Sequence, residues 1–373
     1  MQEGAPPNAD RKTAAAGFQC QACGGRMAYD AGQGRMLCGF CGATRGVGEG
    51  DEARTIVEHD LEHGLGMSAE RGYGARVRRV GCAQCGAVVS YGEHETARAC
   101  DFCGSPQVAA RDDSQLPIRP ESVLPFRIDK KAATAKFSSW LGSLWLRPSD
   151  LQKLAAVSEM TGMYVPYWAF DAKVHSDWTA FAGYYYYVNE TYTTTDDKGR
   201  TVQRQRQVQK VRWQPAWGSR DDAYDDLLVC GSRGLSESTT QTLEPFDTRA
   251  LEPYDPSYLA GWRAEEYSVD LNGGWQRAVA RMEEGQRAHC SCDVPGDTQR
   301  ALNVTNRFAD ERYKHILLPI WISVYRYKEK PFQFLVNGQT GEVTGYAPWS
   351  AVKITLLCLA VALLVVLVYA TQR

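Results

Sequence analysis

The sequence predicts an α+β protein with two small N-terminal cysteine modules, a mostly antiparallel, aromatic-rich α+β domain and one C-terminal hydrophobic helix. Three observations support this fold class. Four C-x-x-C pairs lie within the first 103 residues, most Trp and Tyr residues lie between residues 123 and 348, and residues 354–370 carry no charge.

Length and charge limit the classes of protein to consider. The chain has 373 residues, of which 44% are hydrophobic, enough for two or three domains. A dedicated nucleic-acid-binding protein usually carries a basic excess, and the formal net charge of −2 disfavours that class. Residues 1–17 are small and polar, so we expect them to be disordered. They hold no apolar segment typical of a signal peptide, and we expect the start of the chain to stay in the cytosol.

The cysteines form two modules that share the spacing C-x2-C-x14-C-x2-C and lie 62 residues apart. In a chain without a secretory signal, such pairs indicate metal binding, and disulfides or free thiols are the alternative. Two facing C-x-x-C turns can hold one zinc ion between four sulfurs. The sequence therefore predicts two zinc ribbons. The ligands are Cys20, Cys23, Cys38 and Cys41 in residues 18–45, and Cys82, Cys85, Cys100 and Cys103 in residues 79–106.

Four thiolates leave no open coordination position, so both zinc ions are predicted to be structural. A ribbon of this size cannot bury a core of its own, and metal binding should supply its folding energy. A linker with a short helix is expected at residues 46–78, and a second linker at residues 107–122.

The α+β domain is predicted to span residues 123–348. Apolar spacing between residues 129 and 145 predicts a helix with Asp129 as its N-cap. Residues 164–178 favour a strand, and the residues after it a long β-hairpin with its tip near Asp197–Gly199. Two similar segments, YVPYWAF and LLPIWIS, lie 153 residues apart, and two related halves are one interpretation.

The second hairpin strand places four basic side chains on one face by its period of two. They are Arg204, Arg206, Lys210 and Arg212. The charges can protect an exposed sheet edge, or the face can contact anionic lipid or an acidic partner. Both interpretations stay open.

Two further clusters have a structural and a functional interpretation. His289, Cys290 and Cys292 could hold a metal or form a redox pair, but we expect a buried or half-buried structural pair of cysteines. Four neighbouring aspartates could bind calcium, but we expect a solvated acidic turn. These are Asp221, Asp222, Asp225 and Asp226.

The hydrophobic segment Ile354–Ala370 has 17 residues, and residues 351–370 together predict a transmembrane helix. Trp349 and Tyr369 lie at its two ends, where interfacial aromatics are enriched. Because few residues follow it, we expect a tail anchor. Basic residues are more frequent before the helix than after it, so the large N-terminal part is expected in the cytoplasm of a single-pass protein in the cell membrane.

The sequence lacks the phosphate-binding loop, the nucleophile elbow, the H-E-x-x-H motif and the dinucleotide fingerprint. We therefore expect no enzyme. The predicted function is a non-enzymatic, tail-anchored adaptor that recruits or organises partner proteins at the cytoplasmic membrane. The alternative is a membrane-tethered zinc-ribbon protein that binds nucleic acid.

Three segments resemble one bacterial family: YVPYWAFDA at 164–172, LEPFDTRALEPYDPSYLAGWRAEEYSVDLNGGW at 243–275, and HILLPIWISVYRYKEKPFQFLVNGQTGEVTGYAPWSAVKI at 315–354. Its members carry N-terminal zinc ribbons and a C-terminal membrane segment, and they are often labelled TFIIB-type zinc-ribbon or primosomal helicase-like proteins. The resemblance covers about residues 18–370. The helicase label implies replication restart, which the missing phosphate loop argues against.

Some relatives occur alongside phage-shock and band-7 (SPFH) membrane proteins. The resemblance therefore implies a role at the stressed membrane, with such proteins as partners. Only the eight ribbon cysteines match a family site residue by residue, and no catalytic residue is carried over.

Overall fold

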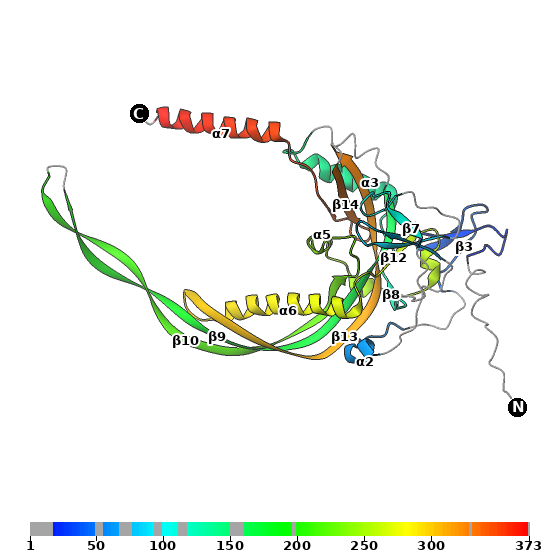
Figure 1. Cartoon of the computed structure of the whole chain (residues 1–373), viewed down its shortest axis with the longest axis horizontal. Helices are drawn as coiled ribbons and strands as arrows, with labels where there is room; N and C mark the ends of the chain where they lie inside the picture. Colours follow the sequence, from blue (N-terminus) through cyan, green and yellow to red (C-terminus); the bar gives the residue numbers. More distant parts are fainter. Residues whose placement is uncertain are drawn as a thin grey trace.

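Three long antiparallel strands organise the molecule (Figure 1). We describe a computed structural model. It describes residues 18–48, 55–66, 77–92, 99–110, 118–148, 160–195, 199–327 and 330–371. The segment predicted to be disordered, residues 1–17, lies outside these ranges, as does much of each predicted linker.

Strand β9 (Thr161–Thr195) lies between β10 (Thr201–Cys230) and β13 (Thr298–Tyr327). It pairs with β10 up to Thr195↔Thr201, so the predicted hairpin is present, although residues 196–198 of its tip lie outside the described part. Its pairing with β13 stops at Gly183↔Thr298. The predicted α+β class with a mostly antiparallel sheet is confirmed.

Short strands widen the sheet at the inner end of these three strands. Strand β12 (Arg263–Glu266) pairs with β9, while β8 (Ser122–Val123) and β14 (Lys330–Asn337) pair with β13. The remaining short strands of this part are β4 (His59–Asp60), β11 (Glu252–Pro253) and β15 (Val343–Gly345). Among the described pairs, β8–β13 and β9–β12 are parallel.

The two similar segments found in the sequence lie opposite each other in β9 and β13. Pro166 pairs with Leu317, and Tyr164 pairs with Pro319. The pairing is symmetric about Val165↔Leu318. A local two-fold axis therefore relates the two motifs.

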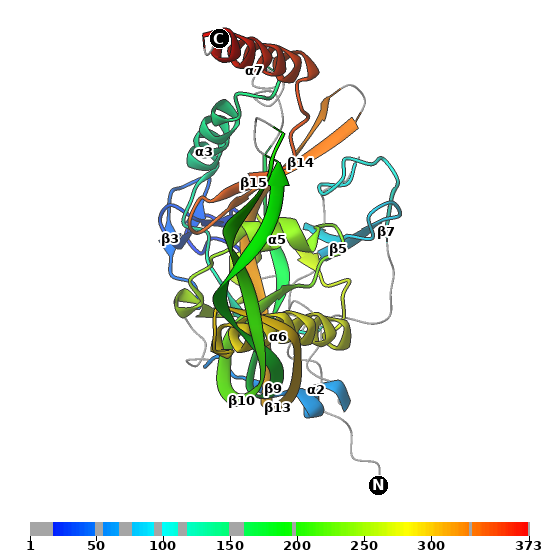
Figure 2. The same ribbon diagram turned by 90° about the vertical axis from the view of Figure 1, so that its left-hand side faces the viewer.

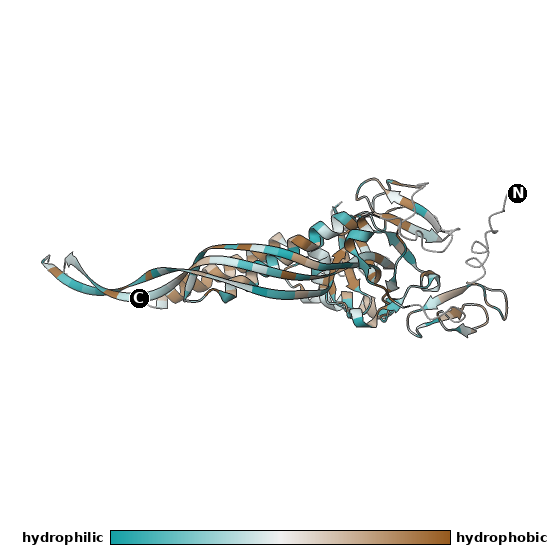
Figure 3. Cartoon of the chain, turned by 90° about the horizontal axis from the view of Figure 1, so that it is seen from below, coloured by the Kyte–Doolittle hydropathy of each residue, from teal (hydrophilic) through white to brown (hydrophobic). Residues whose placement is uncertain are grey.

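Beyond Gly183, the described residues of β9 and β10 pair only with each other. We call this two-stranded part, residues 184–195 and 201–212, the arm. Figure 3 shows that hydrophilic residues predominate along it. Its exposed aromatics are Tyr185, Tyr186, Tyr187 and Tyr192. An isolated two-stranded hairpin is marginally stable in water, so the arm depends on the three-stranded part that continues it.

Aromatic side chains fill the core where the short strands meet. Phe126 stacks on Trp262 with ring centroids 4.1 Å apart, and it meets Tyr164 and Trp321 edge-on at 5.1 and 5.2 Å. The Trp321 Nε1–H donates to the Ile128 carbonyl at 2.9 Å. Much of the aromatic excess in this domain is therefore core.

Two long helices cover the sheet, and two short ones, α2 (Leu61–Gly66) and α5 (Glu237–Leu243), lie at its edges. Helix α3 (Lys130–Ser143) begins as predicted, with the Asp129 side chain accepting from the Ala132 N–H. Helix α6 (Leu271–Asp293) lies along the long strands (Figure 1). Its buried face repeats every four residues: Gly274, Ala278, Met282, Gln286 and Cys290.

Helix α7 (Ala351–Thr371) leaves the body on the same side as the arm (Figures 1 and 2). None of its residues is buried. Its first turn is held by the α3 end of the body, where Lys353 Nζ donates to the Arg147 carbonyl at 2.8 Å. The Arg147 guanidinium lies 3.6 Å from the centre of the Trp349 ring. The predicted C-terminal helix, long and apolar enough to cross a membrane, is present.

Candidate metal centres

The first cysteine module is a small sheet of three strands, β1 (Met27–Asp30), β2 (Arg35–Cys38) and β3 (Thr44–Arg45). Each cysteine pair forms a tight turn closed by a backbone hydrogen bond, from Gly24 N–H to the Cys20 carbonyl and from Gly42 N–H to the Cys38 carbonyl. Both glycines have a φ of 73°, which an L side chain rarely adopts.

The four sulfurs of this module converge. Cys20 Sγ lies 3.5 Å from Cys41 Sγ, Cys23 Sγ lies 3.5 Å from Cys38 Sγ, and all four lie within 4.8 Å of one another. A disulfide would bring two sulfurs to about 2.05 Å. Sulfurs at about 2.3 Å from one tetrahedral ion lie about 3.8 Å apart. The spacing therefore fits four ligands of one metal ion.

Backbone N–H groups in the two turns favour the thiolate form of Cys38 and Cys23. Backbone N–H groups of Cys41 and Phe40 lower the pKa of Cys38 to about 6. The Gly25 N–H favours the thiolate of Cys23 as well, but the sulfurs of Cys41 and Cys38 raise its pKa to about 12. Four neighbouring thiolates repel one another, and a divalent cation at their centre removes that repulsion.

The second module repeats the sulfur geometry on a different set of strands, with β5 (Val77–Cys82) between β6 (Val88–Gly92) and β7 (Val108–Ala110). Its sulfurs lie 3.6 Å apart in the pairs Cys82 with Cys103 and Cys85 with Cys100. The structure therefore brings all eight predicted cysteines into two four-thiol clusters.

The two modules are attached to the body in different ways. Strand β6 pairs with β12, so the second module is part of the main sheet. The first has its own sheet and is attached through Tyr29, whose N–H donates to the Ala260 carbonyl and whose carbonyl accepts from Trp262 Nε1 at 2.8 Å. Only the second module is continuous with the long strands.

The four predicted basic residues lie on the arm, all exposed. They share one face with the β9 side chains that pair with them, among them Glu190 and Tyr192. Lys210 Nζ lies 2.9 Å from a Glu190 oxygen, and Arg206 lies over the Tyr192 ring. The one-faced arrangement is present, and what the face contacts stays a prediction.

The expected pair of structural cysteines at positions 290 and 292 is wrong. The two residues lie in the last turns of α6, where residues two apart point in different directions. Cys290 is buried against the strands and Cys292 is exposed. His289 Nδ1 lies 3.7 Å from a carboxylate oxygen of Asp222 instead.

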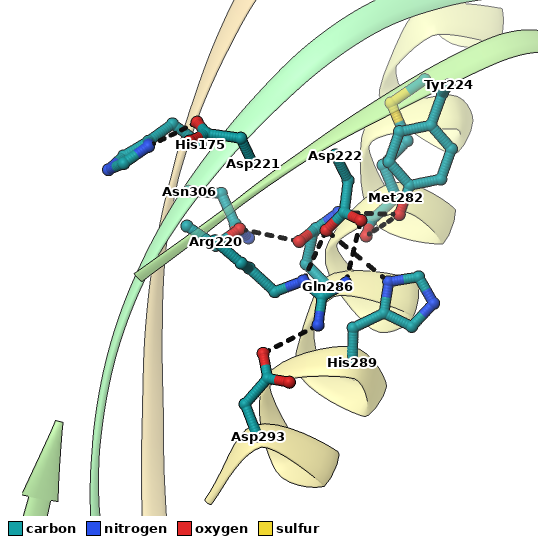
Figure 4. A network of polar contacts seen from close by, with 11 residues as sticks. His175, Arg220, Asp221, Asp222, Tyr224, Met282, Gln286, His289, Asp293 and Asn306 are labelled. Atoms are coloured by element: carbon teal, nitrogen blue, oxygen red, sulfur yellow. Dashed lines mark hydrogen bonds and ion pairs between the residues drawn. The ribbon is translucent and has the colours of Figure 1, made fainter. Parts of the chain in front are cut away.

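The expected acidic turn is a stretch of strand β10. Arg220 donates to Asp222 at 2.6 and 2.9 Å and to Asp293 of α6 at 2.7 Å (Figure 4). The Arg220 hydrogen bond holds the pKa of Asp222 at about 2. Tyr224 and Gln286 extend the same network. These polar groups therefore hold α6 on the sheet.

Asp225 and Asp226 lie near Asp171, which the sequence did not bring into consideration. A positively charged side chain already lies beside these carboxylates: Lys314 Nζ is 2.7 Å from Asp226 Oδ1. The backbone N–H of Asp226 also donates to Asp171 at 2.6 Å. Asp226 is thus paired with a lysine, and Asp171 accepts a backbone hydrogen bond.

Comparison with known proteins gives distant homology. No family model matches the chain, and no solved structure matches it. The chain is 26% identical over 244 residues to "Uncharacterized protein YdjG" of Bacillus subtilis (strain 168). The match covers 64% of this chain and 66% of that protein, slightly less than two thirds of its length.

Proposed function

We propose that this protein is a non-enzymatic adaptor, anchored by α7 in the cytoplasmic membrane with its body in the cytoplasm, that recruits or organises partner proteins there. The observation that carries the proposal is α7 itself. The mean hydropathy of an 18-residue stretch of it is 2.9, and none of its residues is buried. Its 21 residues reach about 31 Å, close to the thickness of a bilayer core.

An apolar helix that contributes nothing to the core is unfavourable in water, because its whole surface stays hydrated. A bilayer removes that cost. Trp349 and Tyr369, both exposed, lie at the ends of the helix where headgroups would surround them.

The two cysteine clusters support an adaptor more than an enzyme. We propose zinc as their metal, since tetrahedral sites made of four thiolates favour it. A zinc ion held by four thiolates has no position left for water or substrate and supplies rigidity. Thiols also stay reduced in the cytoplasm, which supports the proposed orientation.

The partners are proposed from two sources. The basic arm is suited to anionic lipid or an acidic protein surface. The resemblance to zinc-ribbon membrane proteins found alongside phage-shock and SPFH proteins makes those proteins the first partners to test, in a response to membrane stress.

The test compares the proteins captured from solubilised membranes by the full chain and by a form lacking residues 18–48. Only the first module is removed, because β6 of the second pairs with β12. The adaptor proposal requires at least one partner that the shortened form loses. If both forms capture the same set, the first module recruits nothing and the adaptor proposal is contradicted.

Nucleic-acid binding is the second candidate, favoured by the exposed tyrosines interleaved with Arg and Lys on the arm. It predicts DNA or RNA binding by the soluble part at physiological salt, with an affinity that falls steeply as salt rises. Binding that survives substitution of the four arm cations would not support this role for the arm.

A further inference from the structure

The two cysteine modules are internal copies that differ in what covers them. Phe40 of the first and Phe102 of the second occupy equivalent positions between the last two cysteines. Phe102 is 1% exposed, whereas Phe40 is 83% exposed. The ring of Phe40 lies over its own module, since a Cβ added at Gly25 would be 2.7 Å from it. The outer face of that ring is open to solvent.

In the second module, the body covers the equivalent face with a short segment, residues 232–235, that follows β10. Gly234 packs its backbone against the Phe102 ring. Any side chain at this position would clash, because a Cβ added at Gly234 would lie 2.8 Å from the ring. The aliphatic part of the Arg233 side chain lies beside Gly86, and its carbons would be 3.7 Å from a Cβ added at Gly86. Gln333 Nε2 donates to the Phe102 carbonyl at 2.8 Å. The cover thus combines a glycine, an aliphatic stem and one amide donor.

The matching positions of the first module have no such cover among the described residues. A Cβ added at Gly24 or Gly42 would meet no atom within 4 Å, whereas Gly86 and Gly104, their counterparts, have neighbours at 3.7 and 3.3 Å. Cys23 and Cys41 are exposed, while their counterparts are only partly exposed. The open surface is therefore continuous across both cysteine turns.

We propose that this face, formed by Cys23, Gly24, Phe40, Cys41 and Gly42, is a docking site for another protein. The partner presents a glycine-containing turn of the kind that residues 232–235 present to Phe102, with the glycine against the ring and an amide donor for the Phe40 carbonyl. In the second module, the equivalent surface is covered by such a segment of the same chain. An exposed aromatic beside rigid turns also has the features of a binding hot spot.

The proposal rests on the proposed adaptor function and names the place where it holds its partner. The experiment puts the photoreactive residue p-benzoylphenylalanine at position 40 of the full chain in the membranes of its host, and at position 102 in a matched control. Both forms are irradiated, and the crosslinked peptides are identified by mass spectrometry. The metal content of each form is measured first, and two ions per chain show that both modules are folded.

Position 102 should crosslink within the chain, to residues 232–235. Position 40 should crosslink to a different protein, at a peptide with glycine next to the attachment point. Phe40→Ser should then abolish capture of that protein while keeping both ions, whereas Arg35→Ser, an exposed change elsewhere on the module, should leave capture unchanged.

Four results would overturn the docking site: no crosslink at position 40, one to nucleic acid, one to a second copy, or one to residues 1–17 or 49–54 of the same chain. If a captured partner depends on residues 18–48 but not on Phe40, the adaptor function stands without this site. If no partner is captured at all, the adaptor function fails as well.

Discussion

The Asp101 carboxylate accepts a hydrogen bond from the Arg263 guanidinium at 2.6 Å, which joins the second cysteine module to strand β12. The Tyr91 hydroxyl donates to the same carboxylate, also at 2.6 Å. In the first module, glycine (Gly39) stands at the position of Asp101, and this link cannot form. Folding of the body should therefore depend on the second cysteine cluster more than on the first.

Metal loss should have unequal effects, and Cys41→Ser and Cys103→Ser test this as a matched pair. Each variant should lose one of two zinc ions, measured by elemental analysis. Cys41→Ser should unfold only the first module. Cys103→Ser should also lower the stability of the body by about 3–5 kcal/mol, the cost of losing a large buried aromatic such as Phe102. If the body unfolds at the same temperature in both variants, the two modules do not differ in how strongly they support it.

Charges in α7 should release the protein from membranes. Leu359 and Leu363 are about 60% exposed and support no core. Arginine at the centre of a spanning helix costs roughly 2.5–3.5 kcal/mol per residue. The double arginine variant should therefore move to the soluble fraction after carbonate extraction, with the thermal transition of the body unchanged. A form lacking residues 351–371 is the positive control, and continued membrane retention of both would place the main attachment elsewhere.

Removing the charge of the arm should leave folding intact. The variant replaces Arg204, Arg206, Lys210 and Arg212 with Gln. All four are exposed, and water and salt screen exposed ion pairs such as that of Lys210 with Glu190, so their loss should hardly change stability. If the arm contacts lipid, the form without α7 should bind vesicles that contain anionic lipid in a salt-dependent way, and the Gln variant should lose this binding. A variant with Lys at the three Arg positions should keep it.

His315 should make stability depend on pH. Its ring is buried against Trp168, and burial lowers its pKa from 6.5 to about 4, although the Ile118 carbonyl accepts from its Nδ1–H. Between these values the unfolded chain binds a proton that the folded chain does not. The free energy of unfolding should thus be complete above pH 6.5 and fall by about 3 kcal/mol as the pH drops to 4.

Urea denaturation at several pH values measures this dependence. His315→Gln has no imidazole and should show a shallower fall between pH 6.5 and 4. Loss of metal at low pH affects both proteins alike, so the difference between them isolates the histidine. Parallel curves would mean that His315 does not titrate as its burial requires.

The sequence predicted those features that depend on local spacing. The cysteine turns, the Asp129 cap, the hairpin and the apolar helix each follow from residues close together in the chain. The first half of β13 was missed, although Leu302, Val304 and Phe308 alternate there, because its partner strand lies more than 100 residues away. The helical setting of Cys290 was missed because the apolar spacing of the helix weakens toward its end.

The different surroundings of Phe40 and Phe102 could not be predicted either. Both lie in the same motif, and their burial is decided by residues 232–235, which no spacing rule connects to the modules. Copies with one local sequence pattern can thus have separate roles, one as part of a sheet and one as a free surface.

The arm and α7 project from the same side of the body, and this limits how the protein can sit at a membrane (Figure 1). A single spanning helix lets the rest of the protein rotate about the membrane normal and tilt against the membrane. The twelve residues of β9 in the arm extend about 40 Å, and their polar faces cannot enter hydrocarbon. If α7 spans a membrane as proposed, the arm would therefore rest along the headgroups or against a neighbouring protein. This second contact would restrict that rotation. Every copy would then hold its first cysteine module at one distance from the membrane and in one orientation.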